Sequence, residues 1–149
     1  MQSRGELRID PGILGADAFA GEFEVIVPYT EPAVTRAVLE RAAALTAGLN
    51  ARILLVAVYA VPYPSQFVCP TAIHQYLVDQ LTDLAVRSSL PVDSHVVLAR
   101  SREEGFRHML KPGSTVLVGT RRHLWRTSEE RLARTLVSDG HNVALVHVA

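Results

Sequence analysis

Short apolar runs alternate with segments of helical periodicity along this chain, and this alternation constrains its fold more than any other feature. The apolar runs predict strands at residues 24–28, 52–58, 94–99, 115–118 and 142–148. The segments between them predict helices at residues 32–48, 71–88 and 101–110, and from about Ser128 to Gly140. Such an order is typical of a single doubly wound α/β domain with a five-stranded, mostly parallel sheet.

Residues with strong positional preferences mark the ends of these helices. Gly48 suits the end of the first helix, because glycine adopts the left-handed conformation that often follows a helix. Ser101 and Glu104 form an S-x-x-E capping box, in which each side chain accepts a hydrogen bond from an otherwise unpaired backbone N–H. Thr127 and Glu130 form a second capping box at the start of the last helix.

Length and composition fit one domain. The chain has 149 residues, no formal net charge and 48% hydrophobic residues, which is too apolar for a disordered protein. Residues 23–149 make up the domain, and residues 1–22 form an N-terminal arm or linker without sustained periodicity. No apolar run reaches the roughly 18 residues of a membrane span, and the N-terminus lacks the apolar stretch of a secretory signal. We therefore expect a cytoplasmic protein without direct membrane insertion.

The charged residues are unevenly distributed. Residues 100–134 carry nine Lys and Arg against four Asp and Glu, so this segment is basic and the remainder acidic. A basic segment can attract an anion, or it can form a solvated face. No RNA-binding aromatic motif or helix-turn-helix spacing is present, so we expect no nucleic-acid partner. No histidine pair has i, i+4 spacing and Cys69 is the only cysteine, so we expect no metal site.

The chain resembles the universal stress protein domain in its element order and in the ends of two strands. The first strand ends in Val27-Pro28, the fourth ends in Val-Gly-Thr-Arg at residues 118–121, and an apolar strand closes the chain. The resemblance implies a Rossmann-like sheet of the adenine nucleotide alpha hydrolase type, in the strand order 3-2-1-4-5. That order reverses between the first and fourth strands, where open α/β sheets bind ligands. In ATP-binding members of the family this crevice holds the nucleotide.

The resemblance also permits a comparison of the nucleotide site residue by residue. ATP-binding members carry an Asp after the first strand, where this chain has Thr30, and a Gly after the third strand, where it has Arg100. After the fourth strand they carry the motif G-2x-G-9x-G-[ST]. Gly119 fits the first glycine of that motif and Arg122 replaces the second. Ser128 falls at the last position, in a loop that is shorter than the motif requires.

These differences predict a crevice that does not bind ATP in the family manner, and no cofactor is expected. Arg122 is bulky and avoids the positive-φ conformations of phosphate-binding loops, and Glu129 and Glu130 would repel a phosphate from the last helix. The alternative is ATP, another nucleotide or another anion, held by an Arg-rich loop at the crevice between the first and fourth strands. The candidate ligand-binding residues are Thr30, Arg100, Gly119, Thr120, Arg121, Arg122, Arg126 and Ser128.

We expect a regulatory or interaction role rather than catalysis, and no residue is assigned as catalytic. Slow ATP hydrolysis or phosphoryl transfer would need a carboxylate that holds Mg²⁺, and Thr30 stands where the family has that Asp. Helix capping accounts for Ser128 without catalysis. Some domains of this family are attached to amino-acid or cation permeases, which implies a membrane transporter or another protein as partner.

The last strand predicts a homodimer. Residues 142–148 are apolar and contain no Pro or Lys, and in the implied strand order they lie at an edge of the sheet. Antiparallel pairing with a second copy would satisfy the free backbone groups around a two-fold axis, with Val143, Leu145 and His147 at the interface. Members of the family commonly dimerise through this strand. The competing interpretation is that residues 1–22 cover the edge and leave a monomer.

Overall fold

The computed structural model describes residues 23–121 and 128–149. These residues contain a sheet of five parallel strands in the order β3-β2-β1-β4-β5. The strands are β1 (Phe23–Pro28), β2 (Ala51–Ala60), β3 (Val92–Ala99), β4 (Thr115–Arg121) and β5 (Asn142–Val148). The helices are α2 (Pro32–Leu45), α3 (Thr71–Arg87), α4 (Arg102–Met109) and α5 (Ser128–Ser138). The predicted doubly wound α/β fold and its strand order are confirmed.

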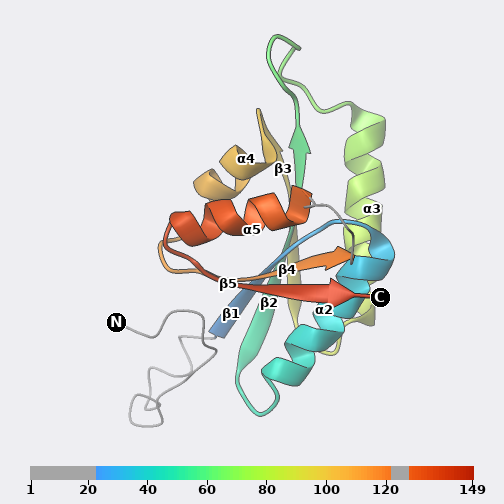
Figure 1. The fold of residues 1–149 in the computed structure, drawn as a ribbon. Helices are drawn as coiled ribbons and strands as arrows, with labels where there is room; N and C mark the ends of the chain where they lie inside the picture. The colour runs from blue at the N-terminus through green and yellow to red at the C-terminus, as the bar shows by residue number, and fades with distance from the viewer. Residues whose placement is uncertain (1–22, 122–127) are drawn as a thin grey trace.

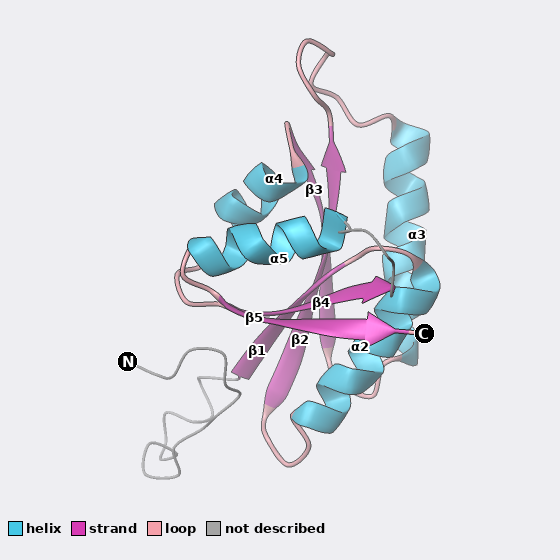
Figure 2. Ribbon diagram, viewed as in Figure 1, coloured by secondary structure: helices cyan, strands magenta, loops and turns pink. Residues whose placement is uncertain are grey.

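Helices cover both faces of the sheet (Figures 1 and 2). Helices α2 and α3 pack on one face, over a core that includes Val25, Val27 and Leu55. Helices α4 and α5 pack on the other face, over a core that includes Ile26 and Phe106. Successive side chains of a strand point to opposite faces, so β1 contributes to both cores, and its continuous apolar sequence follows from burial on both sides.

The register of β1 opens a crevice at the carboxyl end of the sheet. β1 pairs with β2 along its full length, from Phe23 opposite Ala51 to Pro28 opposite Val56. Its pairing with β4 is limited to Val25 and Ile26. β1 and β4 therefore separate beyond Ile26, at the position where the strand order reverses, and the residues that follow each strand line the space between them.

Several predicted boundaries shift in the structure. The first predicted helix ends at Leu45 rather than Gly48, and Gly48 lies beyond it with φ at +84°.

The Ser101 hydroxyl accepts a hydrogen bond from the backbone N–H of Glu104 at 3.1 Å, as the capping box predicts. The Glu104 carboxylate reaches one residue further back than expected and accepts from the N–H of Arg100 at 3.0 Å. The second predicted capping box includes Thr127, which lies outside the described residues.

The predicted arm, residues 1–22, also lies outside the described residues. Across the described residues, no helix combines the length and the apolar character that crossing a membrane requires.

Candidate ligand crevice

A cavity of about 510 Å³ occupies the space where β1 and β4 separate. Strands β1, β2 and β4 contribute the residues at their carboxyl ends, and helices α3, α4 and α5 close the sides. The lining residues are Tyr29, Thr30, Glu31, Val34, Ala57, Val58, Tyr59, Ile73, Tyr76, Leu77, Arg102, Gly119, Thr120, Arg121 and Glu129. The predicted candidates Thr30, Gly119, Thr120 and Arg121 are thus brought together at one site.

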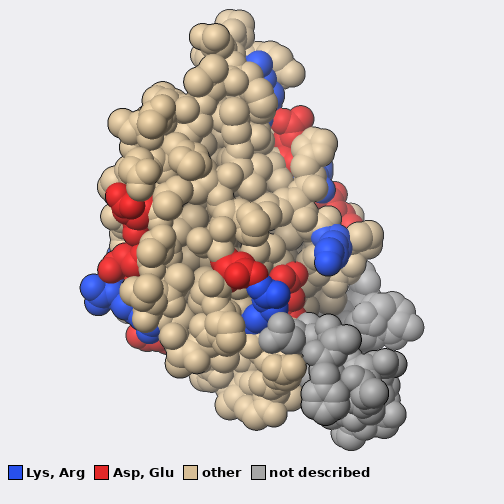
Figure 3. Space-filling model, turned by 180° about the vertical axis from the view of Figure 1, so that it is seen from behind, with Lys and Arg blue, Asp and Glu red and all other residues tan. Residues whose placement is uncertain are grey.

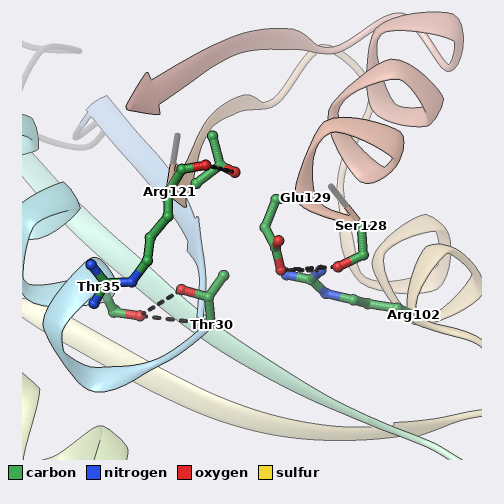
Figure 4. Close-up of polar contacts among 7 residues, drawn as sticks. Thr30, Thr35, Arg102, Arg121, Ser128 and Glu129 are labelled. Atoms are coloured by element: carbon green, nitrogen blue, oxygen red, sulfur yellow. Dashed lines mark hydrogen bonds and ion pairs between the residues drawn. The ribbon is translucent and has the colours of Figure 1, made fainter. Parts of the chain in front are cut away.

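Thr30 is engaged with the start of α2. Its backbone N–H donates to the hydroxyl of the buried Thr35 at 3.1 Å, and the two hydroxyl oxygens are 3.4 Å apart. Figure 4 shows this pair on one side of the crevice, with Arg102, Ser128 and Glu129 on the other. The sequence analysis compared Thr30 with an Asp of ATP-binding universal stress proteins. Thr30 offers a neutral hydroxyl instead of that carboxylate, so it supplies no negative charge to bind a cation.

Gly119 has a packing role. A Cβ atom built on Gly119 would lie 2.4 Å from Cγ2 of Val38 and 2.8 Å from Cγ1 of Val34, both on α2. Such distances are far shorter than a normal van der Waals contact, so glycine permits the close approach of α2 to β4. The next residue, Thr120, is buried and its hydroxyl donates to the backbone carbonyl of Arg121 at 3.2 Å.

Arg121, at the end of β4, is held by acceptors of its own chain. Its Nη2 and Nε atoms lie 2.6 and 3.1 Å from Oε1 of Glu31, which follows β1, and its Nη1 donates to the carbonyl oxygen of Ala149 at 3.1 Å. The hydrogen bond to Glu31 and the negative charge of that carboxylate raise the pKa of Arg121. The pair therefore joins the two sides of the crevice at its mouth.

A second ion pair closes the side formed by α4 and α5. Nη1 of Arg102, in the first turn of α4, lies 3.2 Å from Oε2 of Glu129, in the first turn of α5. The Ser128 hydroxyl donates to the same carboxylate oxygen at 3.3 Å. The other terminal nitrogen, Nη2 of Arg102, is buried without a hydrogen-bond partner. An unsatisfied buried donor of this kind is costly, and an acceptor atom placed in the crevice would relieve that cost.

The opposite wall of the crevice is largely aromatic and aliphatic. Tyr29, Tyr59 and Tyr76 line it together with Ile73 and Leu77. Burial raises the pKa of Tyr29 above its ordinary value, and the nearby Tyr76 and Glu31 add to the shift. Tyr29 is thus held in its neutral form, with a hydroxyl group that can donate a hydrogen bond. The crevice combines an apolar wall with a wall of paired charges.

Arg100 does not line the crevice. Its guanidinium lies over the rings of Tyr63 and Phe67, at 4.2 and 4.6 Å from their centres. Its Nη1 donates to the carbonyl oxygens of Val61 at 3.3 Å and Ser65 at 2.6 Å. The physical reason is that Arg100 follows an edge strand, where the loop after β2 offers carbonyl acceptors and aromatic rings.

Three predicted candidates remain. Ser128 lies beside it and contacts Glu129, while Arg122 and Arg126 lie outside the described residues. The sequence analysis missed Glu31 and Arg102. Arg102 carried one usable signal: it opens a helix that follows a strand, which places it at the carboxyl edge of a parallel sheet.

Across residues 23–121 and 128–149, no group of three or more His, Cys, Asp and Glu side chains is arranged to hold a metal ion. Of the six histidines, His141 is buried, and its Nδ1 accepts a hydrogen bond from the backbone N–H of Ser114 at 3.1 Å. This contact ties the turn before β5 to the start of β4.

Structures of universal stress proteins share this fold. One from Archaeoglobus fulgidus matches with a TM-score of 0.60 and 11% sequence identity, over 85% of this chain and 93% of its own. A universal stress protein in complex with cAMP matches with a TM-score of 0.51 and 13% identity, over 87% of this chain and 100% of its own. No protein-family model and no curated protein matches the sequence. The chain therefore has the universal stress protein fold.

Proposed function

We propose that this chain is a regulatory or interaction domain whose crevice does not bind ATP in the manner of ATP-binding universal stress proteins. The observation that carries the proposal is the pairing of both described crevice arginines with carboxylates: Arg121 with Glu31, and Arg102 with Glu129. A triphosphate at this position would meet two carboxylates as well as two cations. At about 4 Å and an effective dielectric constant of about 20, one such like-charge contact opposes binding by about 4 kcal/mol, which offsets the attraction of one arginine at the same distance.

The end of β4 supports the same proposal. Phosphate cradles of Gly-rich loops place several backbone N–H groups around one anion. Here Gly119 is occupied with helix packing and the Thr120 hydroxyl with the Arg121 carbonyl. Gly119, Thr120 and Arg121 belong to strand β4 and pair with β5, so this segment is not a Gly-rich loop that encircles an anion.

The alternative function is binding of a nucleotide or another anion of lower charge at the same crevice. One observation favours it: Arg102 lines the crevice, and its Nη2 atom is buried without a hydrogen-bond partner. The tyrosine wall suits a planar group, and a universal stress protein of the same fold is described in complex with cAMP. The Arg-rich loop of this alternative also includes Arg122 and Arg126, which lie outside the described residues.

Native mass spectrometry of the purified protein distinguishes the two functions. Under the main proposal the spectrum shows only the masses of the polypeptide and its homodimer, without a bound nucleotide. A retained adduct with the mass of a nucleotide would favour the alternative. The variant Arg102→Leu serves as a control, because a ligand held in the crevice by Arg102 would be lost from it.

The proposed interaction role includes a homodimer through β5, and a membrane transporter or another protein as a further partner. The backbone N–H of Asn142 donates to Ser114, toward β4. Backbone polar groups alternate in direction along a strand, so Val143, Leu145 and His147 present theirs to the free edge. Leu145 is 38% exposed, and a groove of about 430 Å³ beside β5 is lined by apolar residues that include Leu45, Leu117 and Leu145.

A further inference from the structure

The apolar wall of the crevice includes side chains that the protein leaves exposed. Ile73 and Tyr76, both on α3, are 37% and 56% exposed, and both line the cavity of about 510 Å³ between β1 and β4. Apolar and aromatic side chains that gather at a concave, exposed site mark a surface that binds a ligand. Cavities of about 300–1,000 Å³ accommodate small molecules, so the size of this crevice fits a small molecule.

This wall comes from a segment without acidic or basic side chains. Residues 53–78, which include most of β2 and the start of α3, contain no Asp, Glu, Lys or Arg. Figure 3, seen from behind relative to Figure 1, shows a broad face with few charged side chains that reaches the top of the molecule, where the chain passes from β2 to α3. A charged ligand therefore finds no counter-ion on the apolar wall.

The charged side chains of the lining balance one another. They are Glu31, Arg102, Arg121 and Glu129, and they form the two ion pairs described above. An anion in the crevice would face two carboxylates as well as two guanidinium groups, and a cation would face the same four groups with the signs reversed. An uncharged ligand meets neither repulsion. The described lining therefore favours a ligand without net charge.

The guanidinium of Arg102 determines which polar group this ligand carries. Its Nη1 atom donates to Glu129, whereas its Nη2 atom is buried without a hydrogen-bond partner. A guanidinium only donates hydrogen bonds, and leaving a buried donor unsatisfied is costly. The group that would satisfy Nη2 is therefore an acceptor. Among uncharged acceptors, a carbonyl oxygen can be carried in the plane of an aromatic ring system.

We infer that the crevice binds a small, uncharged, planar aromatic molecule that carries a carbonyl oxygen. Its rings pack against the tyrosine wall of Tyr29, Tyr59 and Tyr76, and its carbonyl oxygen accepts a hydrogen bond from Arg102. The inference rests on the proposed function, because the ion pairs that disfavour a triphosphate also leave the crevice without net charge. It names a class of ligand to which neither ATP nor a nucleotide of lower charge belongs.

Coumarin is the probe for this inference, because it is planar, uncharged and carries one lactone carbonyl. The compound 2H-chromene has the same ring skeleton without the carbonyl, and coumarin-3-carboxylate adds a negative charge. Titrations of the full chain, followed by saturation-transfer difference NMR, give the dissociation constant of each compound. Coumarin should bind with a dissociation constant of about 1 mM or below. The other two compounds should bind at least tenfold more weakly.

Protein variants locate the bound probe. Arg102→Lys retains a positive charge beside Glu129 but loses the second terminal nitrogen, so it should bind coumarin at least fivefold more weakly and 2H-chromene equally well. Tyr76→Ser should weaken the binding of both compounds at least fivefold. Val86→Ser, at a 75% exposed position on the same helix, is the matched control and should bind both as wild type does. Circular dichroism verifies that each variant is folded.

The results that would overturn the inference differ from those that bear on the proposed function. Absence of coumarin binding, equal affinity for 2H-chromene, or unchanged coumarin binding by Arg102→Lys would overturn it. Tighter binding of coumarin-3-carboxylate or of cAMP than of coumarin would also overturn it, and would favour the anion-binding alternative. Binding of Mg-ATP would contradict the proposed function, whereas a protein that binds neither Mg-ATP nor coumarin would contradict the inference alone.

Discussion

At the scale of single residues, Gly119 sets how closely α2 approaches β4. The space for its Cβ atom is filled by the methyl groups of Val34 and Val38, and both valines are buried. The sequence comparison aligned Gly119 with a phosphate-loop glycine, and the structure supplies a packing reason for the same residue. A motif position can therefore be kept by packing even where the remainder of the motif is missing.

We predict that Gly119→Ala destabilises the protein by roughly 1–3 kcal/mol, the usual cost of overpacking a well-filled core. Urea unfolding followed by circular dichroism measures this change. The additional substitution Val38→Ala removes the nearer methyl groups, so the double variant should lose less stability than the two single changes add up to. Strict additivity of the two changes would show that the contact between Gly119 and Val38 is not the cause.

The ionisation of Tyr29 makes the free energy of unfolding depend on pH in the alkaline range. Its pKa is raised by burial and then by Tyr76 and Glu31, so the folded state favours the neutral phenol. Its contribution to stability is complete below the ordinary tyrosine pKa of about 10 and is lost as pH rises through the higher folded value. Urea midpoints between pH 9 and 11.5 should fall more steeply for wild type than for Tyr29→Phe. Parallel curves would contradict this assignment.

At the scale of elements, every predicted strand is observed, and the apolar run at residues 142–148 gave the bounds of β5 as the structure has them. β2 was predicted at residues 52–58 and is observed at Ala51–Ala60, because continuous burial gives an unmistakable apolar run. β3 was predicted at residues 94–99 but begins at Val92. Asp93 is polar and exposed on this edge, and it separates Val92 from the apolar run that marked the strand.

The other edge strand, β5, carries the prediction of a homodimer. Wild type should sediment as a dimer at about 50 μM, and Leu145→Pro should convert it to a monomer, because proline removes an outward N–H and cannot pair with a second strand. Leu145→Lys should weaken the dimer by placing like charges near the two-fold axis. A wild-type monomer would reject the prediction, and a dimer that survives both substitutions would place the interface elsewhere.

At the scale of the whole molecule, the crevice depends on contacts that no local pattern reveals. Arg121 and Glu31 are separated by 90 positions in sequence and meet across the crevice, and Arg102 and Glu129 are separated by 27 and meet on one side of it. The sequence indicated where the crevice lies, because the order of elements fixes the position at which the sheet reverses. It also indicated that cations gather there. The packing of α2, α4 and α5 determines which carboxylates meet those cations, and the sequence pattern does not predict this packing.

The central claim is that paired charges close this crevice to ATP, and calorimetric titration with Mg-ATP tests it most directly. Wild type should show no binding tighter than about 100 μM, whereas Glu31→Gln/Glu129→Gln, which removes both negative charges, should bind at least tenfold more tightly, about 1.4 kcal/mol. Glu40→Gln, at an exposed site on α2, is the matched control and should behave as wild type. A wild-type dissociation constant of about 10 μM or below, roughly −7 kcal/mol, would contradict the account.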